Sequence, residues 1–327
     1  MSRWSTGRLM AATTATVATM VSAAGCSVVD RDVPETAGKP AIRAAEAASL
    51  VEQYDIARSR ADASLDADQL AELEAGALLR IDRGLYFQQR ELGLATTPVQ
   101  LDQTTSLIAG SFEEYPLWFV TVNKLVDSQE QVAAVFVRRT STAPWLVTEA
   151  PRLAQSTELG RPEVASDGSA IVFDPVTGRW SDGTTVERGF AQQLIDDYAA
   201  MLTDPGAPGA EQFVADSFVE QMGQLAQAQP GGVDFRQQWQ ADTVRHVVRL
   251  SDGGVLIFAT LVRTDQYTVQ PRSSLDFAEL PASAYLPKPL RASARLDYRH
   301  QVLMLVPSSG KPLVIGQHGG LIGAAGS

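Results

Sequence analysis

Cysteine is nearly absent from this chain of 327 residues, in which Cys26 stands alone. A lone cysteine excludes an internal disulfide, a zinc knuckle and a cysteine-held iron–sulfur cluster. Histidine is rare as well, and His246, His300 and His318 have no second histidine or carboxylate at metal-ligand spacing. We therefore expect no metal and no cofactor. His246, inside a strand-like segment, and His300, at the start of one, are expected to be hydrogen-bonded structural residues.

Motifs for nucleophilic or phosphate chemistry are missing too. The sequence has no G-x-S-x-G, P-loop or G-x-G-x-x-G pattern. Basic residues are in deficit, with 27 Lys and Arg against 38 Asp and Glu. Without a basic cluster to neutralise phosphates, nucleic-acid binding is disfavoured. The one long apolar run, residues 9–21, is shorter than the roughly 20 residues that span a bilayer.

The amino terminus has the three parts of a secretory signal peptide. Arg3 and Arg8 precede the apolar run, and the small residues 22–25 follow it directly before Cys26. We therefore assign residues 1–25 to a signal peptide.

The segment Ala24-Gly25-Cys26 resembles a bacterial lipobox, although Ala23 stands where that pattern prefers Leu. The resemblance implies that Cys26 is lipidated and anchors the mature protein to the outer face of the cell membrane. The alternative is an ordinary signal peptide cleaved near Ala24, which leaves a free exported thiol. Residues 26–41 have two prolines and no periodicity, so they are expected to form a flexible tether.

Helical periodicity followed by strand-like segments appears twice along the chain. Residues 42–160 read as two helices and then several short strands rich in Val, Phe, Trp and Thr. The second helix is expected from residue 66, with Asp66 as its N-cap and a break near Gly84. Residues 161–189 are expected to form a hairpin connection.

Residues 190–327 repeat the order of helices and strands, with a proline-rich insertion at residues 271–293. "SLVEQYD" (49–55) aligns with "QLIDDYA" (193–199), which supports an internal repeat. The alternative is a loose likeness of any two helix-then-strand domains. We predict an α+β fold of two tandem units, each with helices packed on a curved antiparallel sheet.

This order of elements resembles the NTF2-like or cystatin-like cone, in which a curled sheet wraps a helix and leaves an apolar pocket. The chain also resembles a group of uncharacterised actinobacterial lipoproteins. The residues that carry this second resemblance are Ala24-Gly25-Cys26, "YPLWFVTV" (115–122) and "LVIGQHGG" (313–320).

Aromatic residues are the candidates for a ligand pocket or for an interface between the units. The candidates are Tyr54, Tyr115, Trp118, Trp145, Tyr198 and Phe258. Core packing is the alternative role for each of them. Trp118 and Phe119 are neighbours on one strand and should point to opposite faces.

The first functional hypothesis is a non-enzymatic binding or scaffold protein of the cell envelope. It would hold an apolar small molecule, a cell-wall fragment or an envelope protein. A second is an NTF2-like enzyme of the isomerase or dehydratase type, which requires a buried carboxylate or histidine in a pocket. A third is a lipoprotein that positions an envelope enzyme and contacts it through residues 271–293.

Overall fold

The structure is a computed structural model that describes residues 39–96, 98–153, 157, 159–278 and 280–327. Gly38–Ser327 form one compact unit. The predicted signal peptide and Cys26 lie outside the described residues, as does the tether before residue 39.

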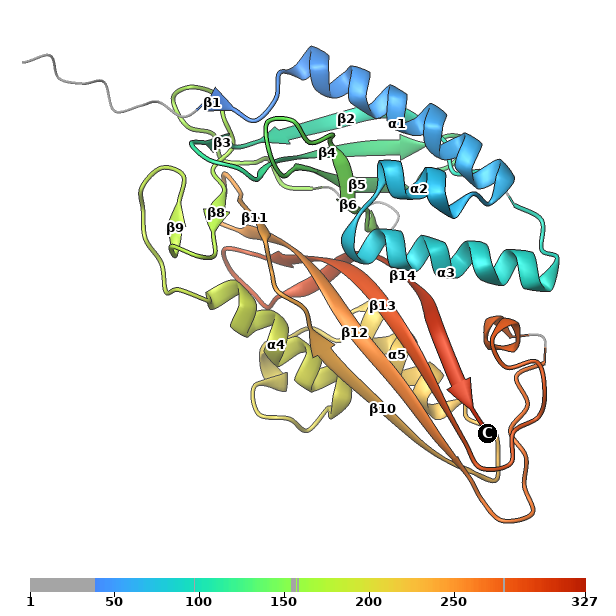
Figure 1. Cartoon of the computed structure of the whole chain (residues 1–327). Coiled ribbons are helices and arrows are strands. Elements are labelled where there is room, and N and C mark those ends of the chain that lie inside the picture. Colours follow the sequence, from blue (N-terminus) through green and yellow to red (C-terminus); the bar gives the residue numbers. More distant parts are fainter. Residues whose placement is uncertain (1–38, 97, 154–156, 158, 279) are drawn as a thin grey trace, which may run out of the picture. The chain divides into compact units, whose positions relative to one another are not determined.

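The first half of the described chain contains three helices followed by a meander of strands (Figure 1). The helices are α1 (Ala44–Ser64), α2 (Ala67–Leu73) and α3 (Gly76–Leu92). The strands are β1 (Lys39–Pro40), β2 (Leu101–Ala109), β3 (Ser111–Phe112), β4 (Leu117–Leu125), β5 (Gln131–Arg138), β6 (Leu146–Glu149) and β7 (Arg152–Leu153).

A small hairpin leads into the second half. It consists of β8 (Phe173–Asp174) and β9 (Arg179–Trp180), which lie within the residues 161–189 expected to form a hairpin connection. The helical elements that follow are α4 (Phe190–Thr203), η1 (Ala210–Gln212), α5 (Ser217–Gln227) and η2 (Pro281–Ala284). The strands are β10 (Val233–Ala241), β11 (His246–Arg249), β12 (Val255–Val269), β13 (Ser293–Val306) and β14 (Leu313–Gly326).

Strands from both halves belong to one antiparallel sheet of ten strands. Its main path runs β10-β12-β13-β14-β7-β5-β4-β2, with β11 beside β12 and β6 beside β5. The short strand β7 connects the halves, because Arg152 pairs with Val132 of β5 and with Gln317 of β14. The α+β class is thus confirmed.

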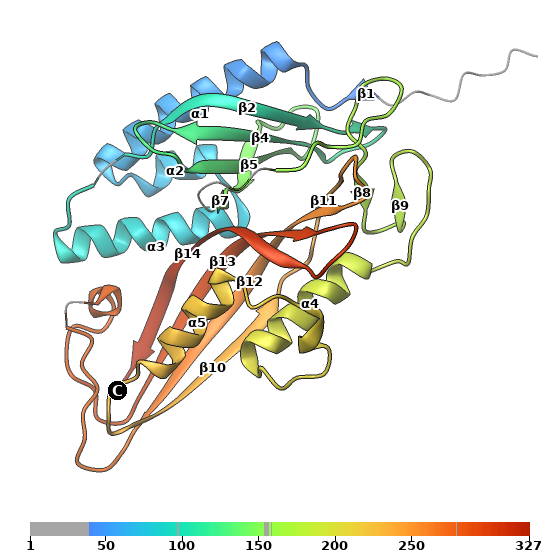
Figure 2. The ribbon, with the colours of Figure 1, turned by 180° about the vertical axis from the view of Figure 1, so that it is seen from behind.

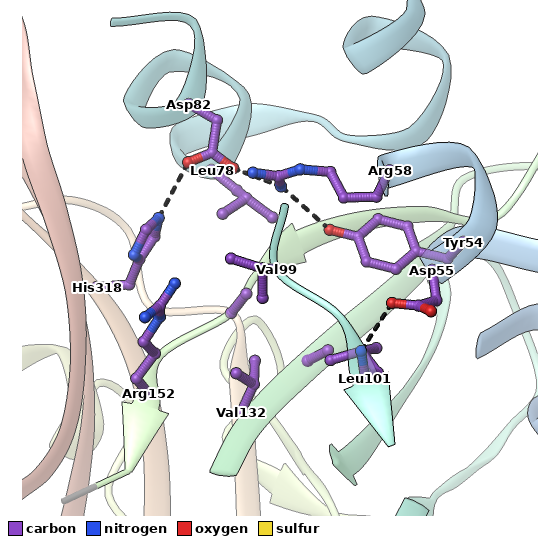
Figure 3. A pocket seen from close by; sticks show the side chains of 12 residues that line it. Tyr54, Asp55, Arg58, Leu78, Asp82, Val99, Leu101, Val132, Arg152 and His318 are labelled. Atoms are coloured by element: carbon purple, nitrogen blue, oxygen red, sulfur yellow. Dashed lines mark hydrogen bonds and ion pairs between the residues drawn. The ribbon is translucent and has the colours of Figure 1, made fainter. Parts of the chain in front are cut away.

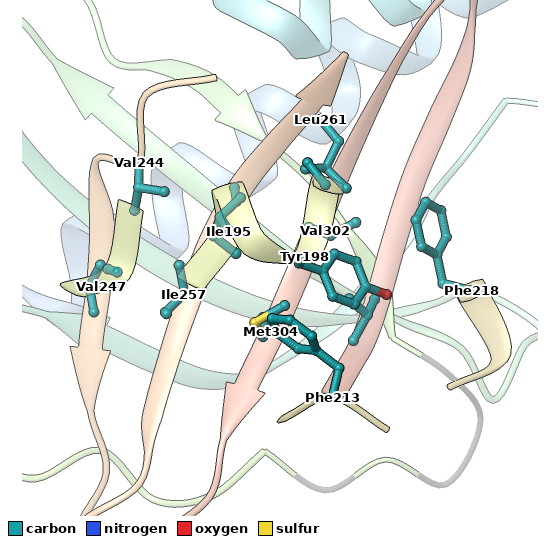
Figure 4. Packing of buried hydrophobic residues seen from close by; sticks show 14 of the residues in the cluster. Ile195, Tyr198, Phe213, Phe218, Val244, Val247, Ile257, Leu261, Val302 and Met304 are labelled. Atoms are coloured by element: carbon teal, nitrogen blue, oxygen red, sulfur yellow. The ribbon is translucent and has the colours of Figure 1, made fainter. Parts of the chain in front are cut away.

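Helices cover different parts of this sheet. Helix α1 packs against β4 and β5, where Val51 meets Phe119 and Phe136 in one apolar cluster. Helices α4 and α5 cover the second-half strands, where Ile195 and Phe218 face the sheet (Figures 2 and 4). Helix α3 contacts both halves, since it packs on β6 as well as on β14.

The second predicted helix begins as expected but is interrupted at a different place. Asp66 caps α2, since its Oδ1 accepts hydrogen bonds from the backbone N–H groups of Asp68 (2.9 Å) and Gln69 (3.0 Å). The chain then breaks before Gly76, which has a φ of 66°. Gly84 lies inside α3, so the break expected there is wrong. The glycine lets the helix backbone approach β14, because a Cβ at this position would lie 2.4 Å from the Leu321 carbonyl oxygen.

The insertion at residues 271–293 is folded rather than a bare loop. Its Leu275, Phe277 and Leu290 are buried against Tyr267 of β12 in a separate apolar cluster. The strand after it begins at Ser293, which places His300 in the middle of β13 and not at the start of a strand.

Candidate functional site

A buried cluster of charged residues centres on Arg58 of α1. Its Nε donates to Asp62 Oδ1 at 2.8 Å, and its Nη1 donates to Asp82 Oδ2 at 2.7 Å and to Glu74 Oε1. Tyr54, Arg58 and Asp62 are spaced four residues apart, so they lie on one face of α1. One guanidinium thus meets three carboxylates from α1, α3 and the residue after α2.

Two tyrosines and a histidine complete this Arg58 network. Tyr54 donates its hydroxyl hydrogen to Glu74 Oε1 at 2.8 Å, and Tyr86 donates to Asp62 Oδ1 at 2.5 Å. His318 of β14 lies with its Nε2 3.1 Å from Asp82 Oδ1 (Figure 3). The network therefore joins the three N-terminal helices to a strand of the second half.

Local backbone bonds hold Glu74 in place. It is the C-cap residue of α2, and its backbone N–H donates to the Leu70 carbonyl at 3.0 Å. The next residue, Ala75, donates to the Val147 carbonyl of β6 at 2.9 Å. The interruption between α2 and α3 thus directs the Glu74 side chain inward, where it is 1% exposed.

The two most buried carboxyls of the network differ in proton affinity. Burial, together with the negative charge of Asp82, raises the pKa of Glu74 to about 8. Burial also opposes the ionisation of Asp82, but Arg58 and His318 outweigh it and lower the pKa of Asp82 to about 2. A protonated carboxyl near neutral pH beside an ionised one is the arrangement from which general acid–base pairs are built.

A small hollow of about 50 Å³ adjoins this network. Tyr54, Asp55, Arg58, Asp82 and His318 lie on its polar side (Figure 3). The rest of its lining is mostly apolar, with Leu78, Val99, Leu101, Val132, Ala134, Ala150 and the side chain of Arg152. A water needs about 10–15 Å³ of such space, so the hollow suits a few waters or a small ion.

The aromatic candidates lie in several different surroundings. Tyr54 lines this hollow, whereas Trp145 packs edge-on against Phe119 at 4.9 Å between ring centroids. Tyr198 is on the buried face of α4 and is fully buried, with its hydroxyl 3.1 Å from Asp216 Oδ2. Phe258 is buried in the sheet core, and Tyr115 is exposed.

Trp118 and Phe119 point to opposite faces of the sheet, as the sequence predicts. Phe119 belongs to the cluster beneath α1, and Trp118 belongs to a separate cluster that includes second-half strands. The Trp118 ring lies 5.0 Å from the ring of His246 on β11. Trp118 is therefore a contact between the halves.

The three histidines differ in their partners. His246 is hydrogen-bonded as expected, with its Nδ1 2.5 Å from Glu149 Oε2. The expectation for His300 is wrong, because both of its ring nitrogens are buried without a hydrogen-bond partner among the described residues. Burial, with a smaller contribution from Arg263, lowers the pKa of His300 to about 3 and keeps it neutral.

Reasoning from the sequence did not single out Arg58, Asp62, Glu74 or Asp82. The available signal was the four-residue spacing of Tyr54, Arg58 and Asp62 on an otherwise weakly amphipathic helix. Within the described ranges, no group of three or more His, Cys, Asp or Glu residues has the geometry of a metal site. The same part of the chain contains no helix that is long and apolar enough to cross a membrane.

The fold and the site define an α+β protein in which a buried network of charged side chains joins the N-terminal helices to a strand of the second half. The chain belongs to the family described as Domain of unknown function (DUF8094), whose model matches residues 38–326. It is also similar to the "Uncharacterized lipoprotein SCO2278" of Streptomyces coelicolor, with 23% identity over 320 residues, 94% of this chain and 92% of that protein. The resemblance to uncharacterised actinobacterial lipoproteins is thus confirmed. No solved structure matches the chain.

Proposed function

We propose that this protein is a lipid-anchored scaffold or binding protein of the cell envelope, without enzymatic activity, exported by residues 1–25 and acylated at Cys26. The segment Ala24-Gly25-Cys26 and the lipoprotein name of the Streptomyces relative support the anchor. The order of helices and strands in each half supports tandem NTF2-like units that share one sheet.

The filled interior is the observation that carries the scaffold role. Of the six aromatic candidates, Trp118, Tyr198 and Phe258 are buried in apolar clusters and so do not line a cavity. The hollow beside the Arg58 network has a volume of about 50 Å³, and a second hollow, lined by Pro40, Val164 and neighbouring residues, has a volume of about 200 Å³. Pockets for drug-sized molecules begin at about 300 Å³. A partner protein held on the surface therefore fits this molecule better than a small molecule held inside.

The insertion is the surface that we assign to the partner. Its apolar residues Phe277 and Leu286 are buried, and the Tyr285 ring lies 4.6 Å from the Phe87 ring of α3. These contacts pre-organise the segment, which lowers the entropic cost of binding. It exposes Leu280, several prolines and the basic residues Arg272, Lys288 and Arg291.

Native mass spectrometry of the protein extracted from its own membrane tests this function. We expect a stoichiometric protein partner, and we expect Leu280→Asp to release it. A co-purifying small molecule in place of a protein would contradict the scaffold role. As a control, Val126→Asp changes another exposed apolar residue outside the insertion, 41% exposed against 53% for Leu280.

The anchor has its own test. The intact mass should show acyl groups on a chain that begins at Cys26, and Cys26→Ala should move the protein from the membrane to the soluble fraction. An unchanged mass and unchanged membrane association of the variant would contradict lipidation.

A second candidate is the acid–base enzyme, and the buried Glu74, Asp82 and His318 favour it. Glu74→Gln separates a catalytic from a structural role. If Glu74 is a catalytic acid, the folded variant loses turnover. If its role is only structural, the pH profile of unfolding changes and turnover is retained.

A further inference from the structure

The chain enters the folded unit at one particular end of the sheet. Strand β1, where the described residues begin, pairs with β3 through Lys39 and Phe112. Pro40 and Val164 line the same hollow of about 200 Å³. Pro162 forms a bridge with Leu250, in the turn that precedes β12. The end of the molecule that the tether enters is thus built from β1, β3 and residues 159–189.

Four apolar side chains are exposed on or near these segments. The exposed fractions are 42% for Tyr115, 58% for Val164, 77% for Val176 and 42% for Val186. Val176 lies in the turn of the β8–β9 hairpin, and the backbone N–H of Val186 donates to the Gly178 carbonyl at 3.2 Å. Tyr115 follows Phe112, the partner of Lys39, by three residues. We name these four residues the tether-end surface.

The tether keeps this surface close to the bilayer. Residues 26–38 are thirteen residues, which reach about 45 Å when fully extended. An anchored Cys26 therefore makes contact between the bilayer and the tether-end surface an intramolecular event, in which weak apolar contacts are sufficient.

The structure assigns the tether-end surface to contact with the lipid bilayer in which Cys26 is anchored, an assignment that rests on the lipid anchor proposed above. The charges around it are net negative, because the single Arg249 pairs with both Glu163 and Asp182. Arg161, Arg179 and Arg188 stand against Asp167, Asp174 and Glu187, and Glu113 and Glu114 beside Tyr115 are exposed as well. The contact is therefore apolar and does not require anionic lipid.

This contact directs the insertion away from the bilayer. Strand β12 has 15 residues and runs from Val255, near the tether end, to Val269, near the insertion. At about 3.3 Å per residue, the two surfaces are separated by about 50 Å along the strand. The bilayer and the partner thus contact opposite ends of the second-half sheet.

The absence of cysteine after residue 26 permits a direct test. Val176→Cys is labelled with nitrobenzoxadiazole in the lipidated protein, whose Cys26 sulfur is blocked, and reconstituted into phosphatidylcholine vesicles. We expect a blue shift of the emission and a loss of fluorescence when the vesicles contain nitroxide-labelled lipid. The matched control is Val126→Cys. Val126 follows β4, at the end of that strand opposite to Tyr115, and its label should show neither change.

A second arm replaces the acyl anchor. A variant that consists of residues 27–327, with a hexahistidine tag in place of Cys26, binds to vesicles that contain nickel-chelating lipid. The combined variant V164D/V176D/V186D should raise the dissociation constant about tenfold, because three apolar contacts are lost. The combined control V126D/L280D should leave the constant unchanged.

Several outcomes would overturn the assignment. They are equal quenching at positions 176 and 126, no quenching at either, an unchanged dissociation constant, or a blue shift at position 176 without quenching. The last outcome would indicate burial against a second copy of the chain. If the mass of the extracted protein shows no acyl group, the proposed lipid anchor is wrong. The experiment with nickel-chelating lipid still tests whether the tether-end surface contacts the bilayer.

Discussion

At the scale of single residues, the Arg58 network brings more negative groups together than one guanidinium can balance. Asp62, Glu74 and Asp82 all contact Arg58, and Asp82 also has His318 beside it. The excess is relieved when Glu74 keeps its proton, as its raised pKa of about 8 indicates. This proton makes the stability of the fold depend on pH.

Glu74→Gln should change that dependence in a definite direction. The pKa of an unfolded Glu is about 4.3, so between that pH and about 8 the native protein holds a proton that the unfolded chain has released. This group therefore lowers the free energy of unfolding by up to about 1.4 kcal/mol per pH unit as the pH rises. A glutamine cannot titrate, so the variant should gain stability relative to wild type from pH 5 to pH 8.

Urea unfolding at four pH values between 5 and 8 measures this difference. Glu72→Gln is the matched control, because Glu72 lies two residues before Glu74, near the end of α2, and is exposed. The free energy of unfolding of this control, plotted against pH, should remain parallel to that of wild type. A parallel profile for Glu74→Gln would mean that Glu74 is ionised in the native protein.

At the scale of elements, the packing of α3 on β14 depends on a missing side chain. A Cβ at Gly84 would meet the Leu321 carbonyl oxygen at 2.4 Å and the Ile322 Cα at 3.2 Å, and both are backbone atoms that cannot rotate away. The same carbonyl accepts a hydrogen bond from Gln88 Nε2 at 2.7 Å. The helix and the strand are thus in direct backbone contact.

Gly84→Ala should therefore destabilise the protein despite the better helix propensity of alanine. The expected loss is about 2 kcal/mol, because the helix must move away from the strand. Gly223→Ala in α5 is the control, since nothing lies within 4 Å of its Cβ position and alanine should stabilise it by up to about 1 kcal/mol. Chemical denaturation of both variants measures the contrast, and a stabilised Gly84→Ala would show that α3 is not in close contact with β14.

Element types were more predictable from the sequence than their ends and contacts. The N-cap at Asp66 and the β8–β9 hairpin follow from local signals, and the structure contains both. The supposed break at Gly84 failed for a physical reason, since a glycine in a helix indicates either a break or a close approach. Only the position of β14 distinguishes the two.

At the scale of the whole molecule, the halves are connected by more than β7. The Gln301 side chain of β13 accepts a hydrogen bond from the Ala150 N–H at 2.9 Å and donates to the Thr148 carbonyl at 2.7 Å. His246 pairs with Glu149, and Asp82 pairs with His318. All of these contacts cross from the first half to the second.

The mature chain should therefore unfold in a single transition. Trp145 reports on the first half, and Trp239 reports on the second. Urea curves of a variant that keeps only Trp145 and of one that keeps only Trp239 should have the same midpoint as the helical circular dichroism signal. Two separate midpoints would indicate halves that fold independently.

The sequence by itself determined the α+β class, most of the helices and strands, the likeness to a lipoprotein family and the exclusion of cysteine-based chemistry. These properties depend on composition or on residues within one or two turns of each other. Only the tertiary structure decided that Asp82 meets His318 and that Gln301 joins the halves. Those partners are far apart in the chain, and the packing of α3 on the sheet and the register of β13 and β14 bring them together. Local patterns contain no information on such pairings, because a buried polar residue favours a hydrogen-bond partner without specifying which one.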